Sequence, residues 1–531
     1  MTTISSHNSP PGRLSTAPTA VTSPRRAWLA VAVISVSLLM IGLDNTILNV
    51  TLPTLQRALG ASSSQLQWTV NAYLLVFAGL LLAAGNLGDR VGRRRTLQAG
   101  LVVFGLGSTL AALSDSAGEL IASRALMGVG AALIMPSTLS IITNIFTGAQ
   151  RVKAIAVWTA VAGLGIALGP VTGGWLLERF WWGSIFLVNV PIAGLALLAG
   201  SFLIPESRDP AAGRPDPIGV VLSVLGLLSL VYAIIEAPTR GWTAAFTLTA
   251  FAAAVVLLGT FVAWELRTSH PMLQMRLFRD PRFSAASASI SLAFFALFGA
   301  LFFLTQYLQL VLGYSPLQAG VRTVPVAAGL VVGSAFSTII NARLGTKLTV
   351  ACGMLLAAGG LTVLAGATPT SSFGRVLTAL LLAGTGIGLA RAPATDSVMG
   401  SLPLAKASVG SAMNDTARLL GGTLGVAVLG TIISQVYRTQ IAVAAAQLPT
   451  ALAEPTRDSV QAALQVAAGL DPTSSSALKA AARLAFTEAM NSAALVAGAV
   501  ALAAALIALL LLPARPAGES RHDNPPAKLS G

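Results

Sequence analysis

The sequence predicts an all-α membrane protein that crosses the bilayer many times. Of its 531 residues, 54% are hydrophobic and only 10% are charged, whereas charged residues make up about a quarter of a typical soluble protein. Apolar stretches of about 20 residues recur along nearly the whole chain, and this length crosses a hydrocarbon core of roughly 30 Å. The stretches lack the strict alternation of a barrel strand, so we expect helices.

Fourteen such stretches can be read from the sequence. They occupy residues 27–48, 66–86, 97–113, 119–143, 153–176, 184–204, 216–236, 246–266, 284–311, 322–341, 347–366, 373–398, 407–435 and 487–512. The first is too long for the apolar core of a cleavable signal peptide, so we expect it to remain as a membrane helix. Residues 1–26 are rich in Ser, Thr and Pro and are expected to be disordered.

The positive charges predict the orientation. Most of the 33 lysines and arginines fall in the two tails and in alternate connections, and positively charged loops stay in the cytoplasm. We therefore expect both termini inside, with 1–26 and 513–531 as cytoplasmic tails and an even number of spans. Because the basic residues are spread over many short loops, the net charge of +14 does not indicate nucleic-acid binding.

Several kinds of chemistry are disfavoured by the composition. A single cysteine and three histidines provide no disulfide framework and no cysteine-based metal site. The chain lacks the G-x-x-x-x-G-K-[ST] phosphate loop, so ATP does not drive it directly. We expect no cofactor, and a proton gradient as the source of energy.

The two halves of the chain resemble each other, which indicates an internal duplication. The segment "DRVGRRRTLQAG" (89–100) aligns without a gap with "ARLGTKLTVACG" (342–353), which places Gly92 on Gly345. Residues 128–141 likewise resemble 384–398. The sequence thus predicts two six-helix bundles, 27–204 and 284–512, with an inserted helix pair and its linkers in 205–283. Such duplication is typical of secondary transporters, whose substrate site lies between the halves.

The loop after the second stretch, "GNLGDRVGRRR" (85–95), combines glycines, an acid and four arginines. Glycines permit a tight reversal, and the acid could dock on a helix N-terminus or pair with an arginine when the cytoplasmic side is shut. A positive-inside anchor would need only the arginines, so the spacing favours a cytoplasmic gate. Its candidate residues are Gly85, Gly88, Asp89, Arg90, Gly92, Arg93 and Arg94.

This loop resembles the signature loop of the major facilitator superfamily. The segments "LDNTILNVTLPTLQRAL" (43–59), "RALMGVGAALIMP" (124–136), "FLVNVPIAG" (186–194) and "SAMNDTARLLGGTLGVAVLGT" (411–431) are similar to its fourteen-helix drug:proton antiporter branch, the EmrB/QacA type. The resemblance covers about residues 27–435. It implies the major facilitator fold, with two six-helix bundles plus two inserted helices.

The fifth stretch contains "GLGIALGPVTGG" (163–174). Small residues on one helix face permit close approach of another helix, and a proline removes a backbone donor. By resemblance this pattern is the antiporter motif of exporters, with residues Gly165, Gly169, Pro170, Gly173 and Gly174.

An acid, Asp44, stands alone in the first stretch, and Arg124 lies at a similar depth in the fourth. The first and fourth helices line the central cavity in the resembling family, so we expect the two charges to face each other across water. Ionisable residues inside the membrane are functional candidates by default. We assign Asp44 to proton binding, in competition with a cationic or amphipathic substrate, although an acid near a helix end can also reach water by itself.

The second half carries another polar group, with Arg391 and Asp396 in one stretch and Asp415 and Arg418 in the next. Asp415 and Arg418 are three residues apart and can pair along one helix face. This pairing is either structural or part of a second proton or cation site, which includes Asp396.

Candidate substrate contacts are polar or aromatic residues on cavity-lining stretches. The phenylalanine-rich segment 294–309 ends in polar residues, and aromatic faces suit flat cations, although core packing explains such phenylalanines equally well. The candidates are Asn45, Asn71, Tyr73, Gln306, Tyr307 and Gln309. The Ala-rich segment 436–486 is expected to form short helices over the extracellular face.

The sequence thus predicts a proton-driven multidrug efflux antiporter of amphipathic or cationic compounds in a bacterial plasma membrane. We expect it to work by alternating access, surrounded by lipid and as a monomer. Three alternatives remain open: an exporter of one endogenous metabolite, antibiotic or lipid, an uptake symporter, and a non-transporting membrane receptor. A membrane enzyme is disfavoured because no set of nucleophile, base and oxyanion donors is evident.

Overall fold

The computed structural model describes residues 23–209, 215–401 and 407–513, and the regular elements in these ranges are all helical. Twelve of the described helices are long and apolar enough to cross a membrane. The N-terminal half comprises α1 (Pro24–Leu59), α2 (Ser63–Val91), α3 (Arg93–Ala112), α4 (Ala117–Ile145), α5 (Gly148–Arg179), α6 (Ser184–Leu187) and α7 (Asn189–Leu203).

An inserted pair and the C-terminal half follow. The pair is α8 (Pro217–Arg240) and α9 (Ala245–Arg267), followed by the short helix η1 (Met275–Arg279). The C-terminal half comprises α10 (Pro281–Gln306), η2 (Tyr307–Val311), α11 (Pro316–Ala365), α12 (Phe373–Gly400), α13 (Ala407–Ala445), α14 (Thr450–Asp458), α15 (Val460–Ala468) and α16 (Pro472–Leu511).

The predicted spans identify the apolar parts of these helices but not their ends. Helix α1 begins at Pro24, close to the expected 27, but extends to Leu59, and α16 begins at Pro472, so these two helices continue past the expected ends at 48 and 487. Segment 436–486 contains the short helices α14 and α15, but α13 and α16 also extend into it. The tails expected to be disordered or cytoplasmic lie outside the described residues at 1–22 and 514–531.

Two glycines at equivalent positions of the internal repeat interrupt the helices. Gly92, between α2 and α3, has φ 129°, and Gly345, inside α11, has φ 76°. Residues other than glycine rarely adopt positive φ values of this size. Gly345 divides α11 into two helical segments, just as Gly92 separates α2 from α3. The two segments that align in sequence, 89–100 and 342–353, therefore also share this break in the helical backbone.

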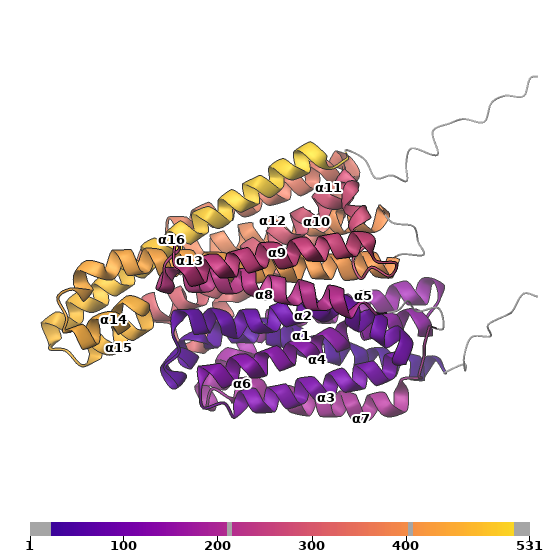
Figure 1. The fold of residues 1–531 in the computed structure, drawn as a ribbon, viewed down its shortest axis with the longest axis horizontal. Helices are drawn as coiled ribbons and strands as arrows, with labels where there is room; N and C mark the ends of the chain where they lie inside the picture. Colours follow the sequence, from indigo (N-terminus) through magenta and orange to yellow (C-terminus); the bar gives the residue numbers. More distant parts are fainter. Residues whose placement is uncertain (1–22, 210–214, 402–406, 514–531) are drawn as a thin grey trace, which may run out of the picture.

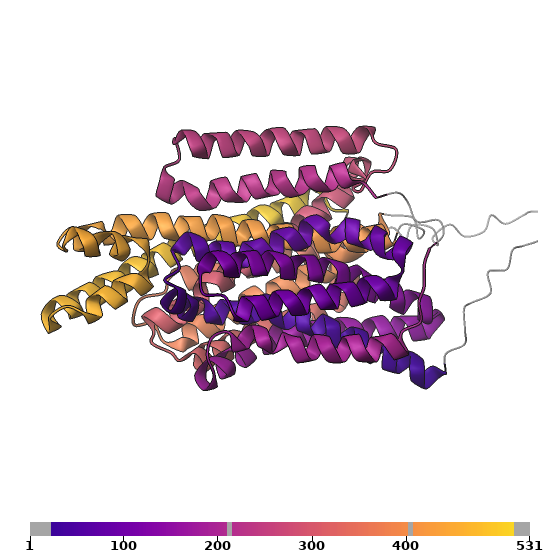
Figure 2. The ribbon, with the colours of Figure 1, turned by 60° about the horizontal axis from the view of Figure 1, so that its bottom comes forward.

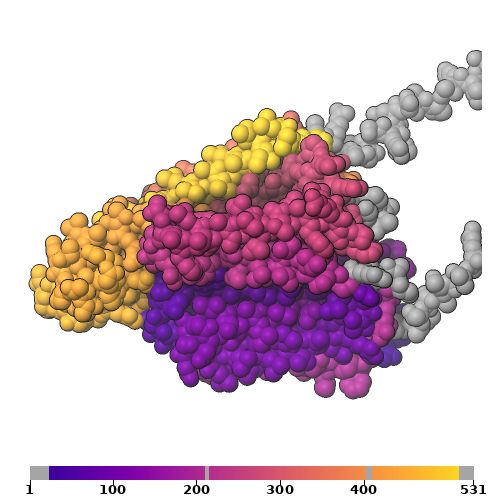
Figure 3. Space-filling model, viewed as in Figure 1, coloured from indigo at the N-terminus to yellow at the C-terminus, as the bar shows by residue number. Residues whose placement is uncertain are grey.

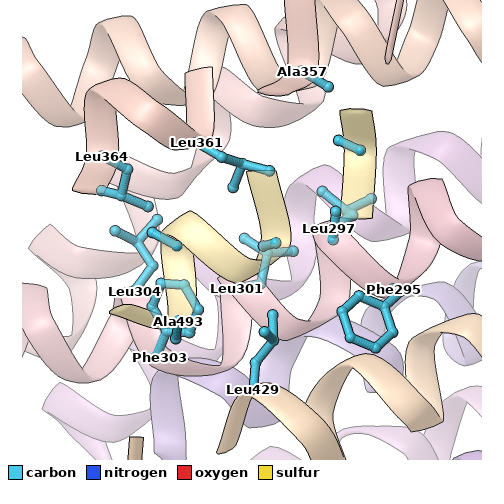
Figure 4. Packing of buried hydrophobic residues seen from close by; sticks show 14 of the residues in the cluster. Phe295, Leu297, Leu301, Phe303, Leu304, Ala357, Leu361, Leu364, Leu429 and Ala493 are labelled. Carbon is cyan, nitrogen blue, oxygen red and sulfur yellow. The ribbon is translucent and has the colours of Figure 1, made fainter. Parts of the chain in front are cut away.

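Most buried hydrophobic side chains belong to two large clusters, one in each half. In the C-terminal cluster, leucines from α10, α11 and α13 pack together with small residues of α11 and α16, as Figure 4 shows for Leu301, Leu361, Leu429 and Ala493. In lipid the hydrophobic effect does not drive helices together, so their association depends on close van der Waals packing. Alanines and glycines permit this because they let the helix backbones approach closely.

The inserted pair lies on the outside of the bundle and covers one side of the interface between the halves (Figures 2 and 3). Helix α8 packs against α2 of the first half and α13 of the second. The Thr431 hydroxyl donates to the Ile234 carbonyl at 2.8 Å, and the rings of Trp68 and Tyr232 lie 5.9 Å apart. Helix α8 therefore contacts both halves.

The α14–α15 hairpin projects beyond one end of the bundle (Figure 1). We call this the hairpin end, and the opposite end, where α1 begins and α16 ends, the terminal end. The hairpin also contacts the first half, because Gln56 Nε2 donates to Ser459 Oγ at 2.8 Å and Ser63 Oγ donates to the Asp458 carbonyl at 2.8 Å.

Helices α1 and α5 are held together by the small residues of α5. A β-carbon on Gly165 would lie 2.9 Å from the Leu39 carbonyl oxygen, and one on Gly169 would lie 2.8 Å from that of Leu43. The Thr46 hydroxyl also donates across this contact to the Ile166 carbonyl at 3.3 Å. The close approach expected from the glycine spacing is present and fixes the position of α1.

Substitution of Gly169 by alanine is predicted to weaken this contact. The added carbon would meet the backbone of α1, so we expect a loss of about 1–3 kcal/mol in the free energy of unfolding. Gly163→Ala is the matched control, because a β-carbon there has no atom within 4 Å and alanine favours helices. Thermal unfolding in detergent measures both variants, and equal stabilities would contradict the packing described.

The docking of the hairpin is predicted to depend on pH. Burial raises the pKa of Asp458 above its ordinary value, against the opposing effects of the Ser63 backbone N–H and of Arg438. A raised pKa in the docked state means that docking is favoured while Asp458 is neutral and weakens as pH rises through that pKa. Amide hydrogen exchange of residues 459–468, corrected for its intrinsic pH dependence, should therefore be slower at acidic pH.

The variant Asp458→Asn tests the cause, since it keeps an acceptor for Ser63 and removes the charge. We expect its amide exchange to lose this pH dependence and to be as slow as in the acidic wild type. A pH profile shared by the wild type and the variant would show that another group is responsible.

Candidate functional site

The two intramembrane charges of the N-terminal half form a direct ion pair. Arg124 Nη1 of α4 lies 2.6 Å from Asp44 Oδ2 of α1. The exposed fraction is 0% for Asp44 and 1% for Arg124. The expectation that the two charges face each other across water is wrong for this conformation, because the side chains touch and are sealed from solvent.

Each charge has additional partners that satisfy its remaining polar atoms. Asn189 Nδ2 of α7 lies 3.5 Å from the second oxygen of Asp44 and 3.4 Å from Ser108 Oγ of α3. Arg124 Nε donates to the Thr69 carbonyl of α2 at 3.2 Å, and its guanidinium lies over the Tyr73 ring at 4.3 Å from the centroid. The pair therefore links four of the long helices of this half and α7.

Local sequence places these side chains. Ser116 caps the N-terminus of α4 by accepting from the Glu119 backbone N–H at 3.2 Å, which begins the helix two turns before Arg124. A capping box between Ser62 and Gln65 begins α2. Asn189 was not selected from the sequence, although a polar residue in the apolar segment "FLVNVPIAG" was a usable signal.

The loop between α2 and α3 is held by residues of its own half. Asp89 Oδ1 accepts from Arg93 Nε at 2.8 Å. Glu206, just after α7, accepts from the Arg94 backbone N–H at 3.2 Å and lies 3.7 Å from Arg95 Nε. A β-carbon on Gly92 would meet this Glu206 carboxylate at 2.6 Å, so glycine is needed there for space as well as for its φ.

The candidate loop residues therefore have different roles in the structure. Asp89 pairs with an arginine rather than with a helix N-terminus. Arg90 is exposed, Gly85 is half-buried and Gly88 is buried. Glu206 was missed because it belongs to the polar linker after the sixth span, where sequence alone does not show which loop the acid contacts.

Hydrogen bonds between the two halves gather at the hairpin end. Thr305 Oγ1 donates to the Asn49 carbonyl at 2.7 Å, and Gln309 Nε2 donates to the Val50 carbonyl at 2.8 Å. In the same region a β-carbon on Gly174 would lie 2.5 Å from the Leu317 α-carbon. Residues Thr46, Asn49, Pro170, Leu301, Thr305 and Val326 line a small pocket at this contact.

Toward the terminal end, α5 is much less covered. Between Gly148 and Leu164 the only buried residue is Ala154. Val152 is 69% exposed, and on α11 Phe336 is 55% exposed. Helices α5 and α11 thus contact each other at the hairpin end and not at the terminal end, which closes the interface at the hairpin end.

The polar group of the C-terminal half lies about halfway along this interface. Arg418 Nη2 is 3.4 Å from Asp415 Oδ1, as the spacing of three residues predicted. The same nitrogen lies 4.0 Å from Met135 Sδ of α4 in the other half. Asp396 is exposed near the end of α12 and forms no ion pair with the other described residues.

The candidate substrate contacts are not brought together at one place. Tyr73 lies under Arg124, and Tyr307 donates to the Thr368 carbonyl within the C-terminal half at 2.6 Å. Gln306 donates to the Phe302 carbonyl of its own helix at 3.0 Å. Asn71 is fully buried with both amide atoms unpaired, and Asn45 Oδ1 also lacks a partner in the structure.

The Asp44–Arg124 pair is predicted to stabilise the fold strongly. Arg124→Gln leaves a buried carboxylate without its cation, so we expect a loss of about 3–5 kcal/mol in the free energy of unfolding. The double variant Asp44→Asn/Arg124→Gln should lose less than the sum of the two single variants, because no uncompensated charge remains buried. A double-mutant cycle from denaturant unfolding measures the difference, and additive losses would contradict the pair.

Comparisons with known proteins agree with this fold. A family model described as Major Facilitator Superfamily matches residues 34–426. The multidrug efflux pump LfrA of Mycolicibacterium smegmatis is 38% identical over 92% of this chain and 97% of its own length. The tetracenomycin C resistance and export protein of Streptomyces glaucescens is 33% identical over 95% of this chain and 96% of its own length. The methyl viologen resistance protein SmvA of Salmonella typhimurium is 36% identical over 87% and 93%.

A solved structure also shares the fold. A bacterial homolog of the human lysosomal transporter Spinster, in an inward-facing and unoccupied conformation, superimposes with a TM-score of 0.64 at 19% identity over 92% of this chain and 98% of that one. The apolar helices and the bacterial relatives together identify a multi-pass protein of the bacterial plasma membrane, a transporter rather than an enzyme. The chain belongs to the Major Facilitator Superfamily.

Proposed function

We propose that the protein is a proton-driven multidrug efflux antiporter that exports amphipathic or cationic compounds by alternating access. The relatives support export of drugs, since their names describe a multidrug efflux pump, an antibiotic export protein and a methyl viologen resistance protein. Proton coupling rests on one observation of this chain, the fully buried Asp44–Arg124 pair.

A buried ion pair couples protonation to conformation. While Asp44 is ionised it neutralises Arg124, and the pair is stable in the absence of water. A proton that reaches Asp44 removes this partner and leaves a guanidinium unpaired, at a cost of about 3–5 kcal/mol. That free energy favours a conformation in which Arg124 is solvated or differently paired. Because Asp44 is sealed here, a substrate competes with the proton through this conformational change rather than by touching the carboxylate.

The proposed cycle assigns a side of the membrane to each end. The hairpin end faces outward and the terminal end faces the cytoplasm, in line with the basic loop residues Arg93, Arg94 and Arg95 near the latter. The conformation described is then closed to the outside, with its proton released and the terminal end of the interface between the halves facing cytoplasmic substrate. The Asp89–Arg93 and Glu206 contacts hold the gate loop within its own half in this state.

The proton gradient supplies enough energy for this exchange. One charge moving through about 150 mV yields roughly 3.5 kcal/mol. At about 1.4 kcal/mol per factor of ten, this sustains a gradient of a few hundredfold for a neutral solute.

The proposal includes membership of the fourteen-helix branch. The twelve apolar helices become fourteen crossings when α3 and the second segment of α11 are each counted as one. Helix α3 is 20 residues long, and the segment of α11 after Gly345 reaches Ala365, so both are long enough to cross. This number returns the C-terminus to the same side as the N-terminus.

Export of a single endogenous antibiotic is the second candidate. The observation that favours it is the 33% identity with a protein named for resistance to, and export of, tetracenomycin C. A tolerance screen over many compounds separates the candidates, because protection against one chemical family alone would indicate the narrow exporter.

The decisive test compares wild type with Asp44→Asn in cells and in everted membrane vesicles. We expect the variant to lose concentrative dye efflux by at least about tenfold, together with the proton movement that dye addition triggers, because neutral Asn cannot take up a proton. Asp115→Asn, an exposed acid at the start of α4, is the control and should behave as wild type.

Loss of folding could imitate loss of coupling, and the double variant Asp44→Asn/Arg124→Gln distinguishes the two. It buries no unpaired charge, so it should be folded and should carry dye only down its gradient. Undiminished proton-driven efflux by either folded variant would refute the role of Asp44.

A further inference from the structure

Arg391 is a charged residue of the membrane region that the proposed cycle does not use. It lies on α12, nine residues before the helix ends at Gly400, which places it about 13 Å from the terminal end. Its side chain is half-buried. Arginine remains charged in proteins, so this depth requires either a partner or water.

The charged groups nearest to Arg391 on the next helix lie at the interface between the halves. Arg391 lies within electrostatic range of Arg418 and Asp415 of α13. Arg418 in turn contacts Met135 of the opposite half and lies over the ring of Phe294, with 5.7 Å to the centroid. Helix α12 is also tied to α13 by a hydrogen bond of 3.2 Å from Thr395 to Asn414.

The charges at this place do not balance. Asp415 is 3.4 Å from Arg418, and Arg391 forms no ion pair or hydrogen bond with the described residues. Asp396, on the same helix, is exposed and lies nearer the terminal end. Two guanidinium groups thus share one carboxylate, which leaves one positive charge in surplus. Because the side chain of Arg391 is half-buried and has no protein partner among the described residues, its guanidinium is left to water or to a bound anion.

Among the described residues of the first half, the acid midway along this interface is Asp44, whereas the unpaired Glu178 lies at the hairpin end against Ser315. Asp44 is fully buried and paired with Arg124. The exposed polar chemistry midway along the interface therefore favours an anion. Guanidinium groups bind carboxylates through two parallel N–H···O bonds, a geometry that adds specificity as well as energy.

We propose that Arg391 is an anion-binding residue of the substrate site. Its guanidinium donates to the carboxylate, or to an equally acidic group, of an amphipathic substrate that enters from the terminal end, while apolar side chains of the interface contact the rest of the molecule. The inference rests on the proposed export function and extends its substrates to amphipathic anions and zwitterions.

The test uses two dyes that differ in one group. Rhodamine 110 carries a free carboxylate, and rhodamine 123 is its methyl ester. Fluorescence titration of the purified protein measures binding, and everted vesicles measure transport. Arg391→Gln should weaken binding of rhodamine 110 by about tenfold, as expected for loss of a charged hydrogen bond, and should change binding of rhodamine 123 by less than about twofold. Arg343→Gln, at an exposed arginine of α11 two residues before Gly345, is the matched control and should change neither.

Two further variants separate an electrostatic role from a structural one. Arg391→Lys keeps the charge but not the paired donors, and its affinity for rhodamine 110 should be intermediate. Asp415→Asn removes the competing carboxylate and should strengthen binding of rhodamine 110. A purely structural role would weaken both dyes in every variant.

The outcomes distinguish this inference from the proposed function. The role of Arg391 would be overturned, and export left intact, by either of two results. In the first, Arg391→Gln weakens the binding and transport of both dyes equally. In the second, the wild type binds and transports rhodamine 123 but not rhodamine 110. Failure of the wild type to bind or transport either dye would overturn both.

Discussion

The architecture of the N-terminal half depends on one ion pair placed where water does not reach. Asp44 and Arg124 approach to 2.6 Å, and their remaining polar atoms are directed to α2 and α7. An arrangement of this kind is destabilised when one of the two charges is removed, because the other would then be buried without compensation. The small residues of α5 hold α1 in the position that the ion pair needs. Helix α1 therefore makes both the ion pair with α4 and the close contact with α5. Asp44 and Thr46 are two residues apart, and the first contacts α4 while the second contacts α5.

The fold could be predicted from the sequence to a large extent. Apolar length identifies the spans, and the alignment of Gly92 with Gly345 identifies the repeat, because both depend on local properties of the chain. Helix ends could not be read in this way. Helices α1 and α16 continue past their apolar parts into polar sequence that still favours a helix, and hydropathy reports only the part that matches the bilayer. Tertiary contacts stabilise these extensions, such as Gln56 against Ser459.

The sequence identifies residues of the candidate site but does not predict how their side chains are arranged. Burial of an acid and an arginine at similar depth marks Asp44 and Arg124 as partners, yet the sequence gives no indication of whether water separates them. Tyr73 and Tyr307 show the same limit. Both are polar aromatic residues near a predicted cavity, and in the structure one lies under a guanidinium and the other is directed into the C-terminal half. Rotation of a helix by a third of a turn exchanges these outcomes, and a single sequence does not fix that rotation.

The position of the inserted pair makes the two sides of the molecule unequal. Helix α8 covers the side where α2 meets α13 and contacts both halves, whereas the side formed by α5 and α11 has no such cover. If one half rocks against the other, both must move along the surface of α8, so the inserted pair restricts the direction of that motion. The inserted pair therefore gives the bundle a covered side and an uncovered one, and a molecule dissolved in the bilayer meets the halves themselves on the side of α5 and α11.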